Sequence, residues 1–580
     1  MIKTWTYLKP DIRKVKTIQN ALKCHEIIAK ILVNRGIHQS ANALSYINTS
    51  PLNMRDPFSL KDMMKAAERT AVAIKSREKI LIFGDYDADG VTSITILHDF
   101  LVRCGSDVTF YIPHRMNEGY GLKAAHIRQF QSNLAPSLII TVDCGMASHD
   151  AALEVKKSEI DLIITDHHAS GETIPEAFAI INPKQSECQS GLSHLAGVGV
   201  VFYFLMALRK HLRDINFFID RPEPNLKQMC DLVAIGTMAD MVPLIDENRI
   251  IVHTGLEVLR SRGRKGLQAI VSLSGINGDE LTAEDIAFKI APRLNSAGRI
   301  GHANIALNLL LETDDKQAMA IARQIEEMNA KRKELEDNIF DQVESYIDRH
   351  PNETYRSIVL SSNYWHLGVL GIVCSRLANK YYKPVILVSL DTAKGTGSGR
   401  SIPGLNLFKI LSMCKNDLLQ FGGHQMATGL TISPDKIQSF KYHFDQIIEE
   451  NHAKEKLIPK LCIDAELDFS DITETLIDQI ETLQPFGEEN PEPVFSSRNI
   501  LIQNTSDIGK HHKRFTLFQK NGKSDKKLNA ICFNYSYPNS KNDKFDQIAY
   551  SIKWNRWKGQ KTAQLVIADF KKISCNLLKE

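Results

Sequence analysis

Three short apolar runs constrain the fold of this chain more than any other feature, because each of them ends in an aspartate. The runs occupy residues 79–84, 137–142 and 160–165, and short runs rich in Ile, Leu and Val are typical of buried parallel strands. The ligand site of an open α/β sheet lies beyond the carboxyl ends of its strands. We therefore expect the polar residues after the runs to form one cluster: Asp85, Asp87, Asp89, Asp143, Asp166, His167 and His168.

Such a cluster of carboxylates indicates a divalent metal site, because like charges at close range raise one another's pKa. Oxygen ligands mixed with imidazole suit Mn²⁺ or Mg²⁺, and the number of candidate ligands favours two ions. Asp240 ends an apolar, helix-like run just before Pro243, and a buried aspartate needs a partner such as a metal. Structural roles also remain open: an acidic capping loop at 84–90, a strand-ending turn at Asp143, hydrogen-bonded core histidines, and a helix cap at Asp240.

A chain of 580 residues exceeds one hydrophobic core, so several domains are expected. Strand-like and helix-like segments alternate from about residue 62 to 240, which indicates an α/β fold with a doubly wound parallel sheet. The expected strands of this sheet are residues 79–84, 107–112, 137–142, 160–165 and 178–182. The expected parts are a helical N-terminal arm (1–60), the parallel-sheet domain (61–313), one long connecting helix (314–349), a smaller α/β domain (350–455) and a β-barrel (460–580). Arg332 interrupts the apolar stripe of the long helix.

The net charge of +3 hides a basic C-terminal segment, since residues 501–580 hold 16 Lys and Arg against 6 Asp and Glu. A basic segment beside a carboxylate-rich site favours a polyanionic partner, although a solvated lysine-rich surface gives the same charge. Ten cysteines without a C-x-x-C pair fit reduced thiols, and we expect a cytoplasmic protein. The longest apolar stretch, residues 198–208, is too short to span a bilayer, and no signal pattern opens the chain, so no membrane partner is expected.

The order of several motifs resembles the DHH phosphoesterase superfamily and, within it, the RecJ family of bacterial single-strand-specific 5′ exonucleases. The resemblance covers nearly the whole chain and rests on LIFGDYDADGVTS, PHRMNEGYG, VDCG, TDHH, INPKQ, LAGVGV, DLVAIGTMADMVPL, APRLNSAGR, GSGRS and FGGHQMATG. It implies a DHH domain, a DHH-associated domain after the long helix, and a C-terminal OB-fold. The implied function is a single-stranded-DNA-specific 5′→3′ exonuclease, which releases mononucleotides by two-metal hydrolysis in DNA recombination and repair.

The resemblance also implies a role for each matching residue. Asp87, Asp89, Asp143, His167 and Asp240 are expected to bind the metals, with Asp85 and Asp166 supporting them and His168 contacting the scissile phosphate. The expected pocket for the 5′-terminal phosphate comprises Ser398, Arg400 and Arg115, and Arg293 and Arg299 are expected on the strand backbone. His424 either reaches the phosphate or braces its glycine turn.

In the OB-like barrel, cationic and aromatic side chains are the expected contacts to single-stranded DNA. They are Lys513, Arg514, Phe515, Trp554 and Trp557, although each aromatic could equally pack the barrel. Single-strand-binding protein and a helicase are the protein partners that the resemblance implies, and we expect a monomer.

Two other functions remain open from the sequence. Smaller members of the superfamily hydrolyse short oligonucleotides or cyclic dinucleotides with similar acidic motifs, but the length and the basic end of this chain argue against that activity. A non-catalytic replication scaffold would have lost metal ligands, whereas every expected ligand is present here.

Overall fold

The computed structural model describes residues 3–351, 356–452, 458–509, 512–519, 526–535, 544–557 and 559–572. The chain divides into two compact units. The first unit contains residues 55–242 and 254–457, and the second contains residues 2–54, 243–253 and 458–580. Among the described helices, none is both long and apolar enough to cross a membrane.

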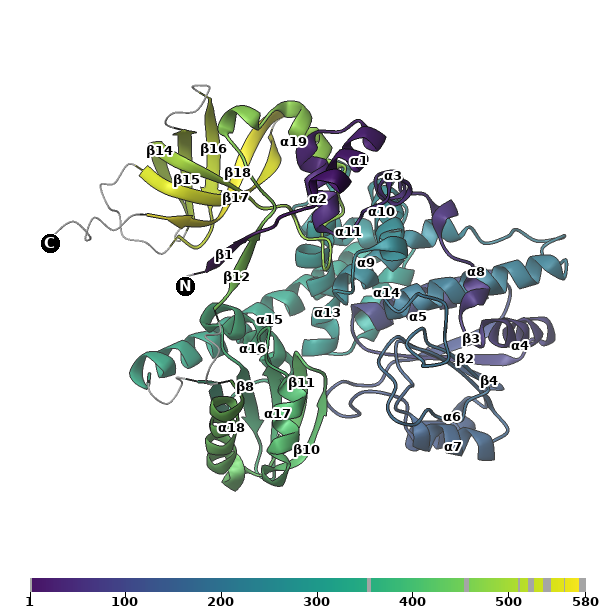
Figure 1. Cartoon of the computed structure of the whole chain (residues 1–580). Coiled ribbons are helices and arrows are strands. Elements are labelled where there is room, and N and C mark those ends of the chain that lie inside the picture. The colour runs from purple at the N-terminus through teal and green to yellow at the C-terminus, as the bar shows by residue number, and fades with distance from the viewer. Residues whose placement is uncertain are drawn as a thin grey trace. The chain divides into compact units, whose positions relative to one another are not determined.

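The first unit begins with a five-stranded parallel sheet in the order β3-β2-β4-β5-β6 (Figure 1). Its strands are β2 (Lys79–Gly84), β3 (Asp107–Tyr111), β4 (Leu138–Val142), β5 (Asp161–Thr165) and β6 (Ala179–Ile181), so the expected doubly wound sheet is confirmed. Every residue of β4 is buried, including Thr141, as expected for a parallel strand in a sheet that is covered on both faces.

Helices cover both faces of this sheet. Helices α6 (Ala124–Asn133) and α7 (His149–Lys157) share a core with the side chains of one face. The other face carries α4 (Met63–Ser76), α5 (Ala88–Arg103) and α8 (Gly197–Asp214). Helices α5 and α8 also contact α9 (Cys230–Ala239). The starts of α5 and α8 and the end of α9 therefore lie near the carboxyl edge of the sheet, where the strand-ending aspartates emerge.

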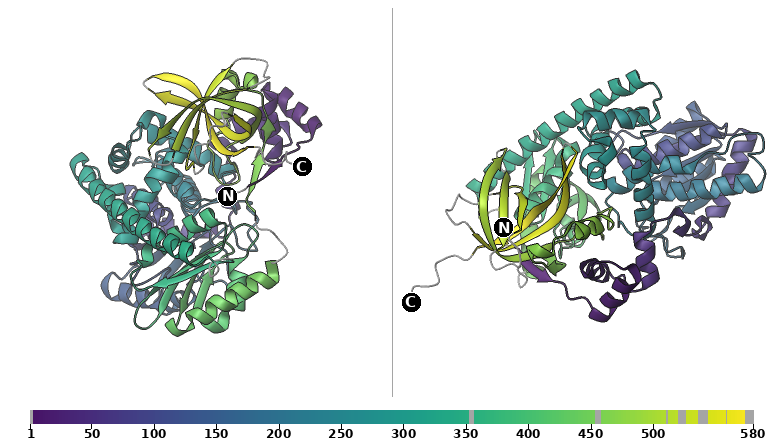
Figure 2. Two further views of the ribbon diagram at one scale, coloured as in Figure 1. Left: turned by 90° about the vertical axis from the view of Figure 1, so that its left-hand side faces the viewer. Right: turned by 90° about the horizontal axis from the view of Figure 1, so that it is seen from above.

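A helical region leads from this sheet to a second one. It comprises the part of α10 (Asp246–Arg260) after residue 253, α11 (Lys265–Leu273), a π-helix (Ile286–Ile290), α13 (Ala291–Ile300), α14 (Asn304–Leu311) and α15 (Asp315–Arg349). The long helix is confirmed as one uninterrupted element, with Asp314 as its N-cap (Figure 2). Arg332 does not interrupt its buried face, because its side chain is 9% exposed and pairs with Glu336 at 2.7 Å.

The second sheet of the first unit is mixed and has the order β10-β11-β9-β8-β7. Its strands are β7 (Ile358–Ser362), β8 (Val385–Leu390), β9 (Gly395–Arg400), β10 (Leu418–Gly423) and β11 (Ala427–Ile432). Helices α16 (Leu367–Tyr381), α17 (Leu407–Met413) and α18 (Ile437–His452) accompany it. The core of this sheet also includes Ile339 and Val343, so α15 packs into it with its C-terminal half.

The second unit contains the expected barrel. Its strands are β13 (Ala465–Glu466), β14 (Phe495–Ile508), β15 (His512–Gln519), β16 (Lys527–Cys532), β17 (Lys544–Trp557) and β18 (Gln560–Lys571), and β17 pairs back onto β14 to close the sheet (Figure 2). The N-terminal arm begins with a strand, β1 (Thr4–Tyr7), which pairs with β12 (Lys460–Ile463). Its helices are α1 (Ile12–Leu22), α2 (Glu26–Asn34) and α3 (Ser40–Ile47).

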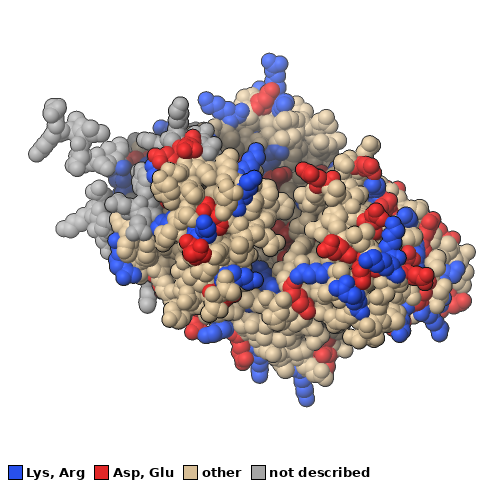
Figure 3. All heavy atoms as spheres, turned by 90° about the horizontal axis from the view of Figure 1, so that it is seen from below, with Lys and Arg blue, Asp and Glu red and all other residues tan. Residues whose placement is uncertain are grey.

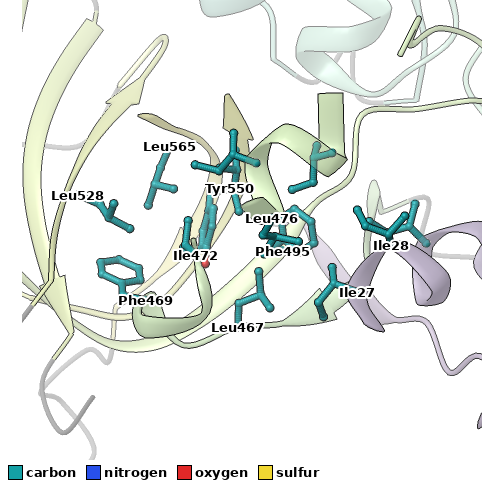
Figure 4. Close-up of a cluster of buried hydrophobic side chains, with 14 of the residues drawn as sticks. Ile27, Ile28, Leu467, Phe469, Ile472, Leu476, Phe495, Leu528, Tyr550 and Leu565 are labelled. Carbon is teal, nitrogen blue, oxygen red and sulfur yellow. The ribbon is translucent and has the colours of Figure 1, made fainter. Parts of the chain in front are cut away.

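The arm and the barrel share one hydrophobic core. Ile27 and Ile28 of α2 lie in the same cluster as Leu467 and as Leu476 of α19 (Glu474–Glu481) (Figure 4). Arg249, which is 2% exposed, donates to the carbonyl oxygens of Tyr46, Thr482, Leu483 and Pro485. The arm is therefore integrated into the second unit.

Candidate metal centre and anion pocket

The polar residues after β2, β4 and β5 converge at the carboxyl edge of the parallel sheet, as the sequence predicts. Three groups of side chains each bring their ligand atoms within 4.8 Å of one another. These groups are Asp85 with Asp87 and Asp143, Asp89 with His167 and Asp240, and Asp143 with His167 and His168. All candidate ligands thus belong to one cluster.

The start of α5 positions Asp87 and Asp89. Asp87 is the N-cap, and its Oδ1 accepts hydrogen bonds from the backbone N–H groups of Asp89 and Gly90 at 3.0 and 3.1 Å. Asp89, in the first turn of the helix, accepts from the first N–H groups of α8, those of Gly197 and Val198, at 2.7 and 2.9 Å. A helix N-terminus stabilises a carboxylate, so Asp89 is held in place with its charge partly compensated.

Two glycines make room for these carboxylates. A Cβ atom at Gly197 would lie 2.4 Å from Oδ1 of Asp143, and one at Gly236 would lie 2.8 Å from Oδ1 of Asp89. Any larger residue at either position would collide with a candidate ligand. Neither glycine stands out in the sequence as a site residue, although both lie in quoted motifs, LAGVGV and DLVAIGTMADMVPL.

His167 faces three carboxylates. Its Nε2 atom lies 3.3 Å from Asp143, 3.5 Å from Asp240 and 4.0 Å from Asp89. Burial, with the charge of His168, lowers the pKa of His167 to about 3, so the ring is neutral and its nitrogen lone pair is available. Asp240 is the C-cap of α9, and its carboxylate also joins the cluster, so the capping and ligand roles coincide.

The electrostatics of the cluster favour a bound cation. Burial, together with the neighbouring carboxylates, raises the pKa of Asp85, Asp89 and Asp143 well above the ordinary value, and that of Asp240 to about 7. Among the described residues, Oδ1 of Asp85, Oδ1 of Asp143 and both ring nitrogens of His167 make no hydrogen bond although they are buried. Buried, unpartnered oxygen and imidazole ligands fit divalent Mn²⁺ or Mg²⁺.

Asp166 has a different environment from the other carboxylates. Its oxygens accept hydrogen bonds from the N–H groups of Met146, His167 and His168 and from the Nδ1 atom of His168. Burial alone would raise the pKa of Asp166, but these bonds outweigh it and lower the pKa. Tyr120, which the sequence analysis did not select, places its hydroxyl 3.1 Å from the same Nδ1 and donates to the carbonyl of Asp143.

Three arginines of the first unit lie close enough to influence one another. Burial and the charge of Arg115 lower the pKa of Arg299 to about 9, and the pKa of Arg400 is lowered mainly by burial and further by Arg115. Among the described residues, no carboxylate lies within 4 Å of these three guanidinium groups. Ser398 is on the same strand as Arg400, two residues earlier, and therefore on the same face of β9. Arg299, which was expected on the strand backbone, therefore joins the three expected pocket residues Arg115, Ser398 and Arg400 in the candidate anion pocket.

Arg293 is paired inside the protein, whereas His424 is exposed in a turn. Arg293 pairs with Glu326 of α15 at 2.5 Å and donates to the carbonyl of Lys289, and its side chain is 12% exposed. Its guanidinium therefore joins α13 to α15, which argues against the expected contact with the strand. His424 is exposed in the hairpin between β10 and β11, where its N–H donates to the carbonyl of Ala427.

The barrel residues divide into core and surface. Phe515 is 2% exposed and packs against Tyr535 and Phe545, so the expectation that it stacks on a base is wrong. Arg514 is exposed, and Lys513 pairs with Asp507 at 3.0 Å.

The two tryptophans expected to contact single-stranded DNA lie near the end of β17. Trp554 is half-buried, donates to Asp478 at 2.8 Å and lies under the ammonium group of Lys561. The side chain of Trp557 lies outside the described residues. Of the two expected aromatic contacts whose side chains the structure describes, Phe515 is buried and Trp554 has part of its ring at the surface.

Three family models match the chain in the expected order. The DHH family N-terminal domain matches residues 79–237, the DHHA1 domain residues 354–450, and the RecJ OB domain residues 463–569. The smaller α/β domain and the barrel therefore carry the implied DHH-associated and OB identities.

Similar proteins extend the match to nearly the full chain. The single-stranded-DNA-specific exonucleases RecJ of Bacillus subtilis and Haemophilus influenzae are 36% and 34% identical over 97% and 96% of this chain, which covers 70% and 98% of their lengths. The crystal structure of RecJ from Thermus thermophilus in complex with Mn²⁺ is 27% identical with a TM-score of 0.82, over 98% of this chain and 80% of that one. From its sequence, its domains and its fold, this chain belongs to the RecJ family of single-stranded-DNA-specific exonucleases.

Proposed function

We propose that this chain is a metal-dependent exonuclease that hydrolyses single-stranded DNA from its 5′ end and releases mononucleotides, in DNA recombination and repair. The observation that carries the proposal is the buried cluster of unpartnered carboxylate and imidazole atoms in a chain of the RecJ family. The Mn²⁺ complex of the Thermus thermophilus relative supports a divalent ion as the cofactor.

The cluster has enough ligands for two divalent ions, Mn²⁺ or Mg²⁺. One group comprises Asp89, His167 and Asp240, and the other comprises Asp85, Asp87 and Asp143. Bound ions would lower the pKa of a water molecule and stabilise charge on the leaving oxygen. The chain itself keeps the ligands in place through the amide hydrogen bonds to Asp87 and Asp89.

In this proposal, His168 contacts the scissile phosphate. Burial opposes the charged form of His168, but Asp166 outweighs it and raises the pKa of the ring to about 9, so the ring is protonated at neutral pH. Because Nδ1 is engaged by Asp166, the other nitrogen, Nε2, can donate to a phosphate oxygen. The side chain is 37% exposed, which leaves it accessible to a substrate.

The anion pocket accounts for the direction of cleavage. Arg115, Arg299, Arg400 and Ser398 would bind the phosphate at the 5′ terminus, since guanidinium groups without carboxylate partners favour an anion. With the first phosphate held there, the next phosphodiester bond would lie at the metal centre. One nucleotide is then released per cycle in the 5′→3′ direction.

The barrel would hold the single strand beyond the cleaved end, with Arg514 and Trp554 as its candidate contacts. Such binding would combine particular cations and rings. On the molecular face that Figure 3 shows, charges of both signs are interspersed. We further propose that the protein acts as a monomer with single-strand-binding protein and a helicase as partners.

A digestion assay tests this function. A single strand with a 5′-phosphate and a 3′ label, incubated with Mn²⁺, should shorten one nucleotide at a time, while a blunt duplex of the same sequence persists. Asp89→Asn should abolish the activity, and Asp150→Asn, an exposed change on α7, should not. Shortening from the 3′ end would refute the direction, and cleavage of dinucleotides alone would favour a short-oligonucleotide phosphodiesterase. Unchanged activity in Asp89→Asn would refute the metal mechanism.

A further inference from the structure

Tyr86 lies between two carboxylates of the metal centre, yet its ring belongs to the anion pocket. The Cζ atom of Arg115 lies 4.6 Å from the centre of the Tyr86 ring, within the range of a cation–π contact. Tyr86 is half-buried, and its ring offers its face to the guanidinium.

The loop that carries Tyr86 has a fixed position. A Cβ atom at Gly298 of α13 would lie 2.5 Å from the carbonyl oxygen of Tyr86, so helix and loop approach closely. The backbone N–H of Ala88 donates to Oδ1 of Asn295 on the same helix at 2.8 Å. These two contacts hold the backbone that carries the ring of Tyr86.

Arg115 needs such a support. Its side chain has many rotamers, and no carboxylate of the described residues lies within 4 Å of it to hold it. A carboxylate would also neutralise the guanidinium and compete with a phosphate for its N–H groups. An aromatic ring orients the guanidinium through its face and leaves the charge and the N–H groups available.

We propose that Tyr86 is a positioning residue of the anion pocket, which holds the Arg115 guanidinium ready for the 5′-terminal phosphate. The proposal deepens the proposed function and rests on it. It also links the two sites, because one tripeptide, Asp85-Tyr86-Asp87, supplies two candidate carboxylates and the support for the phosphate-binding arginine. The same short segment therefore positions both the arginine that would bind the 5′ end of the strand and two candidate ligands of the metal centre.

Equilibrium binding in EDTA tests this role without turnover. The probes are two single strands of one sequence with a 3′ fluorophore, one with a 5′-phosphate and one with a 5′-hydroxyl. Y86L, which removes the ring, should weaken binding of the phosphorylated strand by about three- to tenfold, the range of a cation–π contact, and should weaken the hydroxyl strand less. Y86F keeps the ring and should restore the wild-type preference.

A matched control and a double-mutant cycle complete the experiment. F340L removes a ring at 4.3 Å from another guanidinium, that of Arg376, and should leave both affinities as in the wild type. In an R115A background, Y86L should cause no further loss.

The possible contrary outcomes are distinguishable. Equal affinity of the wild type for both strands would refute the phosphate pocket and, with it, the role of Tyr86. A wild-type preference that persists in Y86L, an equal loss for both strands, or additive losses with R115A would overturn the role of Tyr86 alone.

Discussion

The Nδ1 atom of His168 lies 2.8 Å from Oδ1 of Asp166, and both residues follow the same strand, β5. Asp166 is 1% exposed and its hydrogen bonds are internal, whereas the His168 side chain is 37% exposed. The pair therefore consists of a fixed anion and an accessible cation. The adjacent His167 is neutral by contrast, because burial and the charge of His168 lower its pKa and neither of its ring nitrogens makes a hydrogen bond.

Asp166→Asn should lower kcat by about 10- to 100-fold, because the amide neither charges nor orients His168 as the carboxylate does. Initial rates on a 5′-phosphorylated single strand provide the measurement. Tyr120→Phe removes the longer contact to Nδ1 and the hydrogen bond to the carbonyl of Asp143, keeps the Asp166 carboxylate, and should cause a smaller loss. A wild-type kcat in Asp166→Asn would show that catalysis does not need the Asp166 carboxylate to charge and orient His168.

Gly197→Ala should reduce activity by about tenfold or more, although it adds a single methyl group. The new Cβ would lie 2.4 Å from Oδ1 of Asp143, so the carboxylate must shift. Gly199→Ala is the matched control on the same helix, where the nearest atom is a flexible Leu195 side-chain carbon at 3.3 Å. Equal activity of the two variants would contradict a tightly packed metal centre.

Addition of Mn²⁺ should raise the melting temperature of the metal-free protein. The raised pKa values of Asp85, Asp89 and Asp143 reflect burial and mutual repulsion, both of which a bound cation relieves. At a hundredfold excess over the dissociation constant, binding stabilises the native state by about 2.7 kcal/mol. Thermal unfolding with and without EDTA measures the shift, and Asp143→Asn should reduce it. A shift unchanged in this variant would place the ion elsewhere.

The convergence of the acidic residues could be predicted from the sequence because strand direction alone determines it. The unbroken apolar runs identify parallel strands, and every parallel strand ends at the same edge. The exact partners could not be predicted, because they depend on helix packing: Asp89 bonds to the start of α8, more than a hundred residues later. The same limit applies to Gly197, whose importance lies in a contact with Asp143 and not in its own turn.

The wrong expectation for Phe515 had a local signal that could have corrected it. Phe515 and Leu517 are buried in β15, while Arg514 is exposed and Thr516 half-buried, which is the alternation of a strand with one face in a core. Arg332 is a different case. An arginine in an apolar stripe reads as an interruption, and its burial becomes understandable only with Glu336 as its partner.

Breaking the Arg332–Glu336 pair should destabilise the first unit. R332M or E336L alone leaves an unpaired buried group and should cost about 3–5 kcal/mol of unfolding free energy, whereas the double variant R332M/E336L should cost much less than their sum. Urea unfolding of the four proteins measures the coupling. Additive losses would mean that the two charges do not stabilise each other.

Substitutions at two adjacent residues of β15, Phe515 and Arg514, should affect different properties, the first the stability of the barrel and the second the binding of DNA. F515A removes a ring that packs against Tyr535 and Phe545, and should cost about 3–5 kcal/mol of unfolding free energy. R514A changes an exposed side chain on the opposite face, so the melting temperature should stay near that of the wild type. If Arg514 contacts a phosphate, R514A should weaken single-strand binding at every sequence tested and lower the slope of log affinity against log salt by about 0.7. Fluorescence anisotropy over a salt series measures both effects, and a slope unchanged in R514A would assign the DNA path to another face of the barrel.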